Sequence, residues 1–492
     1  MPDSGPYIVT LDVGSSSVRT ALFNATGEEQ AGFGDHAAFQ ITTTHDGGAE
    51  LDADVLLNLC AGCLAAIHRQ VSEAGIKPAA VALDTFWHNV LGIDLHGKPV
   101  TPIMHLFDTR SIGEVAELKQ RLDPVQVHRR TGCPLYPSYW PSKLMWLSRQ
   151  RPEAFKAAQR WVSLGEYLSL QFLGVSADST SMMSGSGLWN QAENDYDELV
   201  LSALPASRGQ LSDVSAMDRP ATRLAEIWRS KLPLFDEIPW FPALGDGACN
   251  NIGSGCATVK EFSIMVGTSG AMRVVVEGPP IDVPAGLWCY RVDRKRIITG
   301  GSLSNGGDVY AWMRRTLVLP SATDTEAELR KRRPGEHDLL VLPFFAGERS
   351  PYWRPDLRAA ITGIDLATQP MDILQAALES VALRFREIFM LMTGSLGRPR
   401  HVIASGGALL ASEAWTQMMS DAMGVPVVTC LEQEATSRGA ALLALERLGA
   451  IPSVTGVPYK CATAKSPDET NARAYTELEA AQDKLFKKLF TL

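Results

Sequence analysis

The chain has 492 residues, of which 45% are hydrophobic and 21% charged, and Asp and Glu (55) outnumber Lys and Arg (46). This composition excludes a disordered chain, and a net charge of −9 without a dense basic run makes nucleic acid an unexpected partner. The length favours two domains with a ligand site in the cleft between them, because one hydrophobic core rarely organises so many residues.

The first residues enter a strand pattern at once, without the basic and apolar segments of a targeting signal. No uninterrupted apolar run reaches the length that a bilayer requires. We therefore expect a cytoplasmic protein with no membrane partner.

Three short strands, a long helix and a fourth strand are predicted at the start of the chain. Apolar residues bounded by turn residues predict strands at 7–14, 17–24 and 28–39. Apolar residues at helical spacing predict a helix over 51–74, and the apolar run 79–86 suits a buried strand.

Two of the eight cysteines, Cys60 and Cys63, have the spacing of a metal-binding pair. Both fall on the apolar stripe of the predicted helix and no second pair accompanies them, so buried core cysteines are favoured over zinc ligands or a redox couple. Eight cysteines in a chain of this length are also too few for a disulfide scaffold.

A similar order of elements returns in the second half. Strands are predicted at 262–270, 272–278, 286–292 and 296–301, followed by a helix at 305–317 and a strand at 339–345. The segment 11–16 (LDVGSS) parallels 265–269 (MVGTS), but only the first copy carries an acid before its glycine. Two duplicated α/β units, since specialised, are therefore expected.

Helices and strands alternate after residue 370. Proline and glycine punctuation predicts helices at 370–393, 412–424 and 435–449, with strands at 401–407 and 426–430 between them. The last stretch, 466–492, has apolar residues at helical spacing, namely Tyr475, Leu478, Ala481, Leu485 and Leu489. A packing helix is expected there, with a partner surface as the alternative.

The turn after the first strand is a candidate phosphate site. Asp12 lies at the strand end and is followed by Gly14, Ser15, Ser16 and Ser17. Backbone amides and hydroxyls of such a turn can approach phosphate oxygens, while the carboxylate can hold hydrated Mg²⁺. For this turn alone, a plain hairpin is an equal alternative.

The GTSG turn, with Gly267 and Thr268, repeats this chemistry in the second half. Two facing phosphate turns are what a nucleotide in a cleft needs, so the pair supports phosphate binding better than either turn alone. No GxxxxGK[ST] motif occurs in the sequence, so a P-loop is excluded.

Two further glycine motifs have both a structural and a functional interpretation. Gly406 and Gly407 stand between a predicted strand and a helix, where an adenine can lie against the backbone or where an ordinary turn suffices. Asp246, between two glycines, is by itself a helix N-cap. Its place just before the second phosphate turn favours a carboxylate that orients a hydroxyl and accepts its proton.

These segments, in this order and spacing, resemble the FGGY carbohydrate kinases of the actin, hexokinase and Hsp70 superfamily, over nearly the whole chain from Tyr7 to Gly449. Supporting segments are LDLHGKPVTPIMHLFDTRS, TGCPLYPSYWPSKLMWL, LPFFAGERSPYWRPDLR and EATSRGAALLALERLG. The resemblance implies an α/β fold of two duplicated actin-like, ribonuclease H-like domains around a cleft. Residues 1–250 would bind the sugar and carry the first phosphate motif, and residues 251–492 would bind the nucleotide.

The resemblance also implies ATP and Mg²⁺ and assigns roles to individual residues. Asp246 falls on the catalytic base, and Asp12 and Asp246 on the metal site. The implied nucleotide-binding residues are Gly14, Ser15, Ser16, Ser17, Gly267, Thr268, Gly306, Gly406, Gly407 and Ala408. The implied substrate-binding residues are Trp87, His88, Asp108, Arg110, Tyr139, Asp246 and Gly247.

Three departures from the family pattern fall on the substrate side. The usual Met-His is Trp87-His88, the tryptophan of W-x-D-x-R is Leu106, and the residue after the base is Gly247 rather than Asn or Gln. GDGA, VGTSGAMR, LWCYRV, GGSLSNGG and LPFFAGERSP resemble the gluconate kinase versions of the family motifs.

Gluconate, converted to 6-phosphogluconate, is therefore the predicted substrate, with Arg110 or Arg349 as the cation for its carboxylate. Structural salt bridges are the alternative for both arginines. Xylulose, another ketose or a short polyol is the alternative substrate, and a catalytically silent sugar-binding protein the alternative function. A homodimer is a family expectation.

Overall fold

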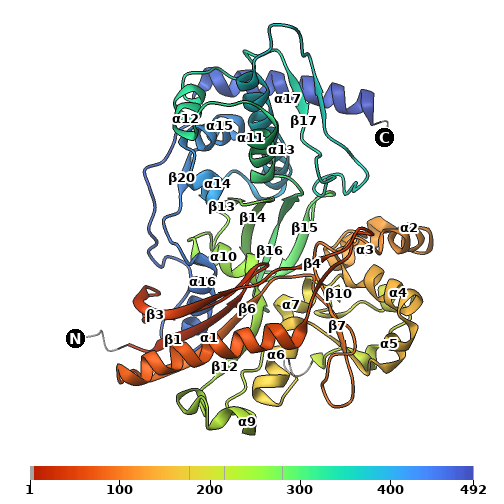
Figure 1. The fold of residues 1–492 in the computed structure, drawn as a ribbon, viewed down its shortest axis with the longest axis vertical. Helices are drawn as coiled ribbons and strands as arrows, with labels where there is room; N and C mark the ends of the chain where they lie inside the picture. Colours follow the sequence, from red (N-terminus) through yellow and green to blue (C-terminus); the bar gives the residue numbers. More distant parts are fainter. Residues whose placement is uncertain (1–4, 177, 215–216, 280, 491–492) are drawn as a thin grey trace.

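The computed structural model describes residues 5–176, 178–214, 217–279 and 281–490. Two mixed sheets, one from each half of the chain, form the centre of the molecule, and helices cover both (Figure 1). The first sheet has the order β12-β6-β1-β2-β3, and its strands are β1 (Tyr7–Val13), β2 (Ser17–Phe23), β3 (Glu29–Ala38), β6 (Pro78–Thr85) and β12 (Trp240–Gly245).

The second sheet repeats this topology with one additional edge strand. Its order is β15-β16-β14-β13-β19-β20, and its strands are β13 (Glu261–Val266), β14 (Gly270–Glu277), β15 (Trp288–Arg291), β16 (Arg296–Leu303), β19 (His401–Ser405) and β20 (Val427–Thr429). In each sheet three neighbouring strands are antiparallel. The first strand of these three also pairs in parallel with another strand, and a further parallel strand lies beyond that one. The predicted duplication is confirmed.

Long helices cover the sheets at corresponding points of the two halves. After the meander comes α1 (Ala53–Glu73) in the first half and α13 (Pro370–Leu396) in the second, and between the parallel strands come α6 (Leu164–Leu173) and α15 (Glu413–Met423). The last helices of the repeats are α10 (Asp246–Gly253) and α16 (Ala435–Arg447). Pro370 is the first residue of α13, and Gly424 ends α15 with φ of 64°, as the punctuation predicted.

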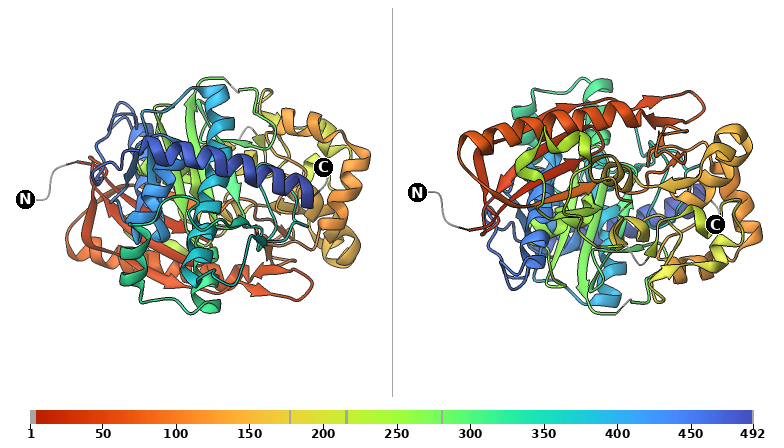
Figure 2. Two further views of the ribbon diagram at one scale, coloured as in Figure 1. Left: turned by 90° about the horizontal axis from the view of Figure 1, so that it is seen from above. Right: turned by 90° about the horizontal axis from the view of Figure 1, so that it is seen from below.

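Cys60 and Cys63 lie on the buried stripe of α1, with exposed fractions of 0% and 1%, which confirms core cysteines. By length and composition α1 is the one helix among the described residues that could cross a bilayer. Its apolar stripe instead packs on the first sheet, beside Leu11 and Leu22. Figure 2 shows this helix along one side of the molecule.

The two halves meet where α10 crosses α16, and glycines allow this close crossing. A Cβ on Gly253 would lie 1.7 Å from the carbonyl oxygen of Ala435, and one on Gly439 would lie 1.8 Å from that of Cys249. Although it comes from the second half, α16 also packs on β1 and β6 of the first sheet. The helix pair therefore joins the two sheets.

Smaller elements fill the connections within the first half. Most of them form a lobe with its own apolar core (Figure 1), and others pack against the core of the first sheet. These elements are β4 (Thr42–Thr43), β5 (Ala49–Leu51), β7 (Leu91–Ile93), β8 (Ile103–Met104), α2 (Ile112–Arg121), α3 (Pro124–Thr131), α4 (Trp140–Gln150), α5 (Pro152–Ala157), β9 (Arg160–Val162), α7 (Thr180–Ser184), β10 (Trp189–Asn190), β11 (Asp195–Tyr196), α8 (Glu198–Leu201) and α9 (Glu226–Arg229).

The second half carries α11 (Gly307–Thr316), α12 (Ala322–Leu329), α14 (Gly407–Leu410) and α17 (Glu469–Leu489). The strand expected at 339–345 is the short β17 (Leu340–Leu342), which pairs only with β18 (Ala360–Thr362), outside the second sheet. The predicted helix at the C-terminal end packs as expected, but its buried residues are Tyr475, Gln482 and Phe486. Leu489, placed on the stripe by its spacing, is 46% exposed.

Candidate active site

Three carboxylates are brought together where the parallel strands of the first sheet end. Asp12 of β1 lies in register with Asp84 of β6, and Asp84 with Leu244 of β12, two residues before Asp246. Ligands of α/β sheets bind beyond the carboxyl ends of parallel strands. Cys249 lies on the first turns of α10. The pKa of its thiol is raised by burial and then by the charges of Asp84, Asp12 and Asp246, so all three acids lie near the start of this helix.

Asp84 is a site residue that sequence reasoning missed, because its strand pattern only indicated a buried position. The side chain is fully buried, and neither carboxylate oxygen receives a hydrogen bond from an N–H or hydroxyl group of the described residues. Burial raises the pKa of Asp12 to about 6, with Asp84 beside it, and burial followed by the charge of Asp12 raises the pKa of Asp84 well above its usual range. Such an arrangement favours a shared proton or a cation.

Asp246 is the first residue of α10, and the N-cap position belongs to Gly245. Its Oδ1 accepts a hydrogen bond of 2.7 Å from the backbone N–H of Gly247. Burial raises the pKa of Asp246, against the opposing effects of Arg273 and of the amides of Gly247 and Trp87. A half-buried carboxylate with a raised pKa is suited to accepting a proton.

The donor chemistry of these acids fits Mg²⁺. Oxygen ligands without competing donors are what this cation prefers, and Asp84 has two such oxygens beside Asp12. No three His, Cys, Asp or Glu side chains among the described residues form a metal cluster by themselves. Mg²⁺ in proteins usually keeps several waters and is held by one or two carboxylates together with phosphates of a substrate.

The two predicted phosphate turns occupy equivalent places in the two sheets, each joining the first and second strands. In the first turn Gly14 N–H donates to Ser17 O at 3.0 Å, and in the second Gly267 N–H donates to Ser269 O at 3.0 Å. Ser16 and Thr268 at the turn tips are exposed. Both turns therefore offer hydroxyls and free amides to a ligand.

A cavity of about 540 Å³ opens beside the second turn. Four predicted nucleotide residues line it: Gly267, Thr268, Gly407 and Ala408. Sequence reasoning missed the remaining lining residues, which α11 and the loop after β17 supply: Gly307, Asp308, Ala311, Trp312, Arg315 and Phe345. The rings of Trp312 and Phe345 lie 4.9 Å apart and form an aromatic pair in the lining of this cavity.

Gly406 and Gly306 shape this cavity without lining it. Gly406 has φ of 88°, and a Cβ on it would lie 2.5 Å from the carbonyl oxygen of Val266. A Cβ on Gly306 would lie 2.7 Å from Ser269 O. Both glycines let the starts of α14 and α11 approach the second turn.

An aromatic wall built from both halves of the chain lies next to Asp246. Trp87 is 5% exposed, its Nε1–H donates to Ser181 O at 3.0 Å, and its ring lies edge-on to Tyr290 of β15 at 5.0 Å. Tyr139 shares a hydrogen bond of 2.6 Å with the hydroxyl of Tyr290. The structure therefore brings Trp87 and Tyr139 together, with Tyr290 as a residue that sequence reasoning missed.

His88 is held in a left-handed backbone conformation with φ of 65°. Lys143 Nζ donates to His88 O at 2.6 Å, and His88 Nδ1 lies 2.7 Å from Gly185 O. Burial lowers the pKa of His88 to about 3, so the ring is neutral at physiological pH. With Nδ1–H donating to the carbonyl, Nε2 is an acceptor.

Asp108 and Arg110 pair with each other, and the substrate-binding role expected for them stays a prediction. Asp108 is fully buried, accepts from Ala49 N–H at 3.0 Å and pairs with Arg110 Nη2 at 2.6 Å. Arg110 also pairs with Glu50 and lies over the ring of Trp146 at 4.2 Å. In this structure the Arg110 guanidinium is therefore paired with two carboxylates, as in the salt-bridge alternative.

Arg349 is placed differently. Its Nη2 donates to Leu303 O at 2.6 Å, and none of the ion pairs among the described residues involves it. Its charge lowers the pKa of His88, after the larger effect of burial and that of Lys143, so the guanidinium faces the aromatic wall.

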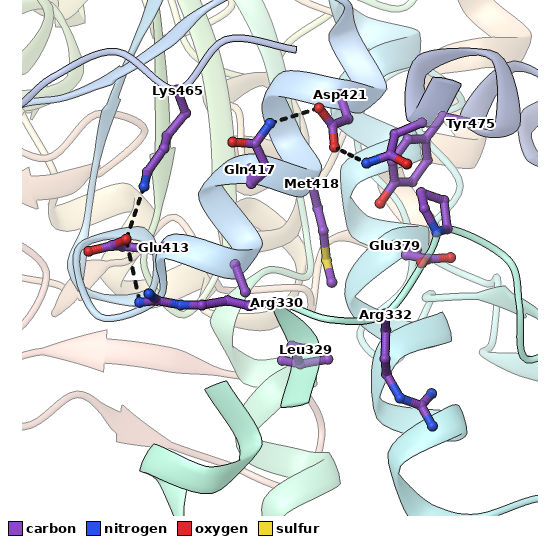
Figure 3. A pocket seen from close by; sticks show the side chains of 13 residues that line it. Leu329, Arg330, Arg332, Glu379, Glu413, Gln417, Met418, Asp421, Lys465 and Tyr475 are labelled. Carbon is purple, nitrogen blue, oxygen red and sulfur yellow. Dashed lines mark hydrogen bonds and ion pairs between the residues drawn. The ribbon is translucent and has the colours of Figure 1, made fainter. Parts of the chain in front are cut away.

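A second cavity, of about 210 Å³, lies between α12, α13, α15 and α17 (Figure 3). Its charged side chains pair with one another or with their neighbours: Glu413 binds both Arg330 and Lys465, and Arg332 binds Asp372. It contains none of the residues predicted for catalysis, so the candidate site is the one at the sheet ends.

The fold and the site define a two-domain phosphotransferase, with carboxylates at one sheet and a nucleotide-sized cavity at the other. Residues 7–253 match the N-terminal domain, and residues 262–446 the C-terminal domain, of the FGGY family of carbohydrate kinases. The chain belongs to this family and is a carbohydrate kinase that acts on a small-molecule sugar with ATP.

Individual relatives agree with this assignment. The chain is 28% identical to a gluconokinase of Bacillus subtilis (strain 168) over 487 residues, covering 96% of this chain and 94% of the relative. It is 20% identical to a xylulose kinase of Staphylococcus xylosus, covering 89% and 90%. The crystal structure of gluconate kinase from Lactobacillus acidophilus superposes with a TM-score of 0.90 at 24% identity, over 99% of this chain and 98% of the other.

Proposed function

We propose that the protein phosphorylates gluconate to 6-phosphogluconate, with Asp246 as catalytic base. The observation that carries the phosphotransfer is the position of Asp246 just after β12, where the ends of the parallel strands bring it close to Asp12 and Asp84. The choice of gluconate is supported by the gluconokinase relative, which aligns over nearly the whole chain.

In the proposed reaction a substrate hydroxyl, lying against Trp87 and His88, gives its proton to the Asp246 carboxylate. The hydroxyl oxygen forms a bond to the γ-phosphorus of ATP, and the bond from that phosphorus to the bridging oxygen of ADP breaks. The products are the sugar phosphate and ADP, and the proton leaves Asp246 for solvent. The raised pKa of Asp246 makes this carboxylate a better base than one in water.

We place ATP in the cavity beside the second turn. Trp312 and Phe345 would stack on the adenine, and Gly407 and Ala408 would lie beneath it, because aromatic rings and bare backbone both accept a flat base. The phosphates would extend to the turns at 14–17 and 267–268. Asp12 and Asp84, with Asp246 near them, would hold Mg²⁺, which neutralises phosphate charge when bound.

We further propose that residues 1–250 and 251–492 close around the two substrates. The α10–α16 crossing lies between the sheets and joins them, so a small rotation there changes the distance between the two phosphate turns. Closure would exclude water and suppress the hydrolysis of ATP.

A ketose kinase remains the second candidate, because the aligned xylulose kinase covers most of the chain and Arg110 is already paired. A coupled assay of ADP release with gluconate, xylulose, glycerol and no sugar separates the candidates. We expect the largest kcat/KM with gluconate and negligible turnover without sugar. A larger kcat/KM with xylulose would replace the proposed substrate, and no turnover with any sugar would favour a silent binding protein.

A further inference from the structure

One cation beside the catalytic base has no role so far. Arg273 lies on β14, where residues alternate between the two faces of the second sheet. Met272 and Val274 enter the core under α13, whereas Val275, on the same side as Arg273, enters the core shared with α10. Arg273 therefore points toward the start of α10, where Asp246 and Gly247 lie.

The guanidinium of Arg273 lies against these two residues. A Cβ on Gly247 would lie 3.2 Å from Arg273 Nε, so the missing side chain at 247 leaves the guanidinium beside the base. Burial lowers the pKa of Arg273, and the charge of Asp246 opposes this effect. Even so, no ion pair joins the two residues, since none of the pairs among the described residues contains Arg273.

Arg273 has buried donors without acceptors. Its Nε and Nη1 atoms are shielded from solvent and have no hydrogen-bond partner. Leaving a buried charged donor unpaired is costly. Arg110, by contrast, is paired with both Asp108 and Glu50. An arginine that stays unpaired beside a catalytic base is poised for an anionic ligand.

A second guanidinium faces the same place. Arg349 comes from the loop after β17, and its charge lowers the pKa of Arg273, after the larger effect of burial. The acid next to it in sequence, Glu348, lies 3.9 Å from Arg384. Arg273 and Arg349 therefore lie near one another, and Arg273 is the one that lies beside Asp246.

We propose that Arg273, assisted by Arg349, binds the carboxylate of the sugar acid beside Asp246 and thereby sets the preference for aldonic acids over neutral sugars. The planar guanidinium matches a carboxylate in two parallel hydrogen bonds. A neutral substrate would leave its buried donors unpaired, which is how a polar site rejects an analogue that lacks the matching group. This inference rests on the proposed function and names its specificity residue.

A phosphoryl group of ATP would offer similar oxygens, but the surroundings of Arg273 favour the sugar. Its neighbours are Gly247, Tyr290 and Arg349, all at the aromatic wall. It does not line the cavity that we assign to ATP.

The test compares gluconate with glucitol, in which a hydroxymethyl group replaces the carboxylate. Steady-state kinetics would be measured for the wild type, Arg273→Met, Arg273→Lys, and the control Arg121→Met on the exposed face of α2. For Arg273→Met we expect the KM for gluconate to rise about 10- to 100-fold, as for the loss of a charged hydrogen bond. The KM for ATP and the values for glucitol should change less than about twofold, and Arg273→Lys should fall between.

The inference is overturned if Arg273→Met keeps the wild-type KM for gluconate, or if kcat falls equally for both sugars while the KM for ATP rises, because the latter identifies a phosphate-binding residue. Circular dichroism and thermal unfolding establish that each variant is folded. Binding of gluconate without ATP, measured by calorimetry, separates the two proposals. If the wild type binds gluconate through Arg273 but phosphorylates only neutral sugars, the proposed function is wrong while the role of Arg273 in binding the carboxylate stands.

Discussion

The indole ring of Trp87 occupies the space that a side chain at position 247 would need. A Cβ on Gly247 would lie 2.7 Å from Trp87 Cζ3, and one on Gly245 would lie 1.9 Å from Trp87 Cε2. Trp87 and Gly247 are two of the positions at which the sequence departs from its family pattern. The contact couples the two positions, because the ring at 87 fills the space that a side chain at 247 would need.

Gly247→Asn should therefore destabilise the protein by about 1–3 kcal/mol, as overpacking does, and raise the KM for the sugar. Trp87→Met in the same chain should relieve the overlap, so the double variant is expected to be more stable than the sum of the single effects by about 1 kcal/mol or more. Chemical denaturation measures both quantities. Gly113→Asn, where a Cβ meets nothing within 4 Å, is the control, and additive effects at 87 and 247 would show that the two changes are independent.

Asp246→Asn should reduce kcat by about 10²–10⁴-fold, because the amide cannot accept the proton of the hydroxyl. The affinity for ATP, measured by calorimetry, should stay within about twofold, since the nucleotide cavity belongs to the other sheet. The amide preserves the shape of the side chain and its hydrogen bond with Gly247 N–H. A variant that keeps most of the wild-type kcat would mean that another group is the base.

Trp312→Ala should raise the KM for ATP about 5- to 10-fold, because one aromatic face of the cavity is lost, and leave the KM for the sugar unchanged. Leu410→Ala is the matched control, since Leu410 follows the cavity residues of α14 but is 53% exposed. An unchanged KM for ATP in the Trp312 variant would show that the adenine binds at another place.

Acid should destabilise the native state through His105. Burial, followed by the charges of Lys143 and His88, lowers the pKa of His105 from 6.5 to about 3. Between these two values the unfolded chain binds a proton that the native state does not, so stability falls as the pH falls, by about 2 kcal/mol from pH 6.5 to pH 5. His105→Asn should flatten this part of the curve of unfolding free energy against pH, and His96→Asn, at an exposed residue, should not.

Gly439→Ala tests the α10–α16 crossing. Its Cβ would lie 1.8 Å from Cys249 O, so the helices must separate, and we expect a loss of about 1–3 kcal/mol together with a lower kcat if the crossing is the hinge. Gly394→Ala in α13 has no neighbour within 4 Å of the new Cβ and should be neutral or stabilising by up to about 1 kcal/mol. A loss of stability with an unchanged kcat would show that the crossing contributes to packing but is not the hinge of closure.

Local chemistry let the sequence predict most of the framework. Strand and helix periodicity, with Pro370 and Gly424 as punctuation, located the repeated units. The turns at 14–17 and 267–268 were recognisable by their glycine and hydroxyl residues directly after a predicted strand. These features depend on neighbours in the chain, so they can be read without the fold.

Contacts between distant segments were decided only by the tertiary structure. Asp84 lies beside Asp12 because two parallel strands end side by side. Trp312 and Gly407 line one cavity because α11 and α14 both start beside the second turn. The pairing of Arg110 with Asp108 and Glu50 appears only in the fold. Arg273 lies in an apolar strand, and the sequence pattern did not indicate it as a site residue. Burial and pairing, which decide whether a charge is available to a ligand, are properties of the assembled fold, as is the contact that couples Trp87 and Gly247.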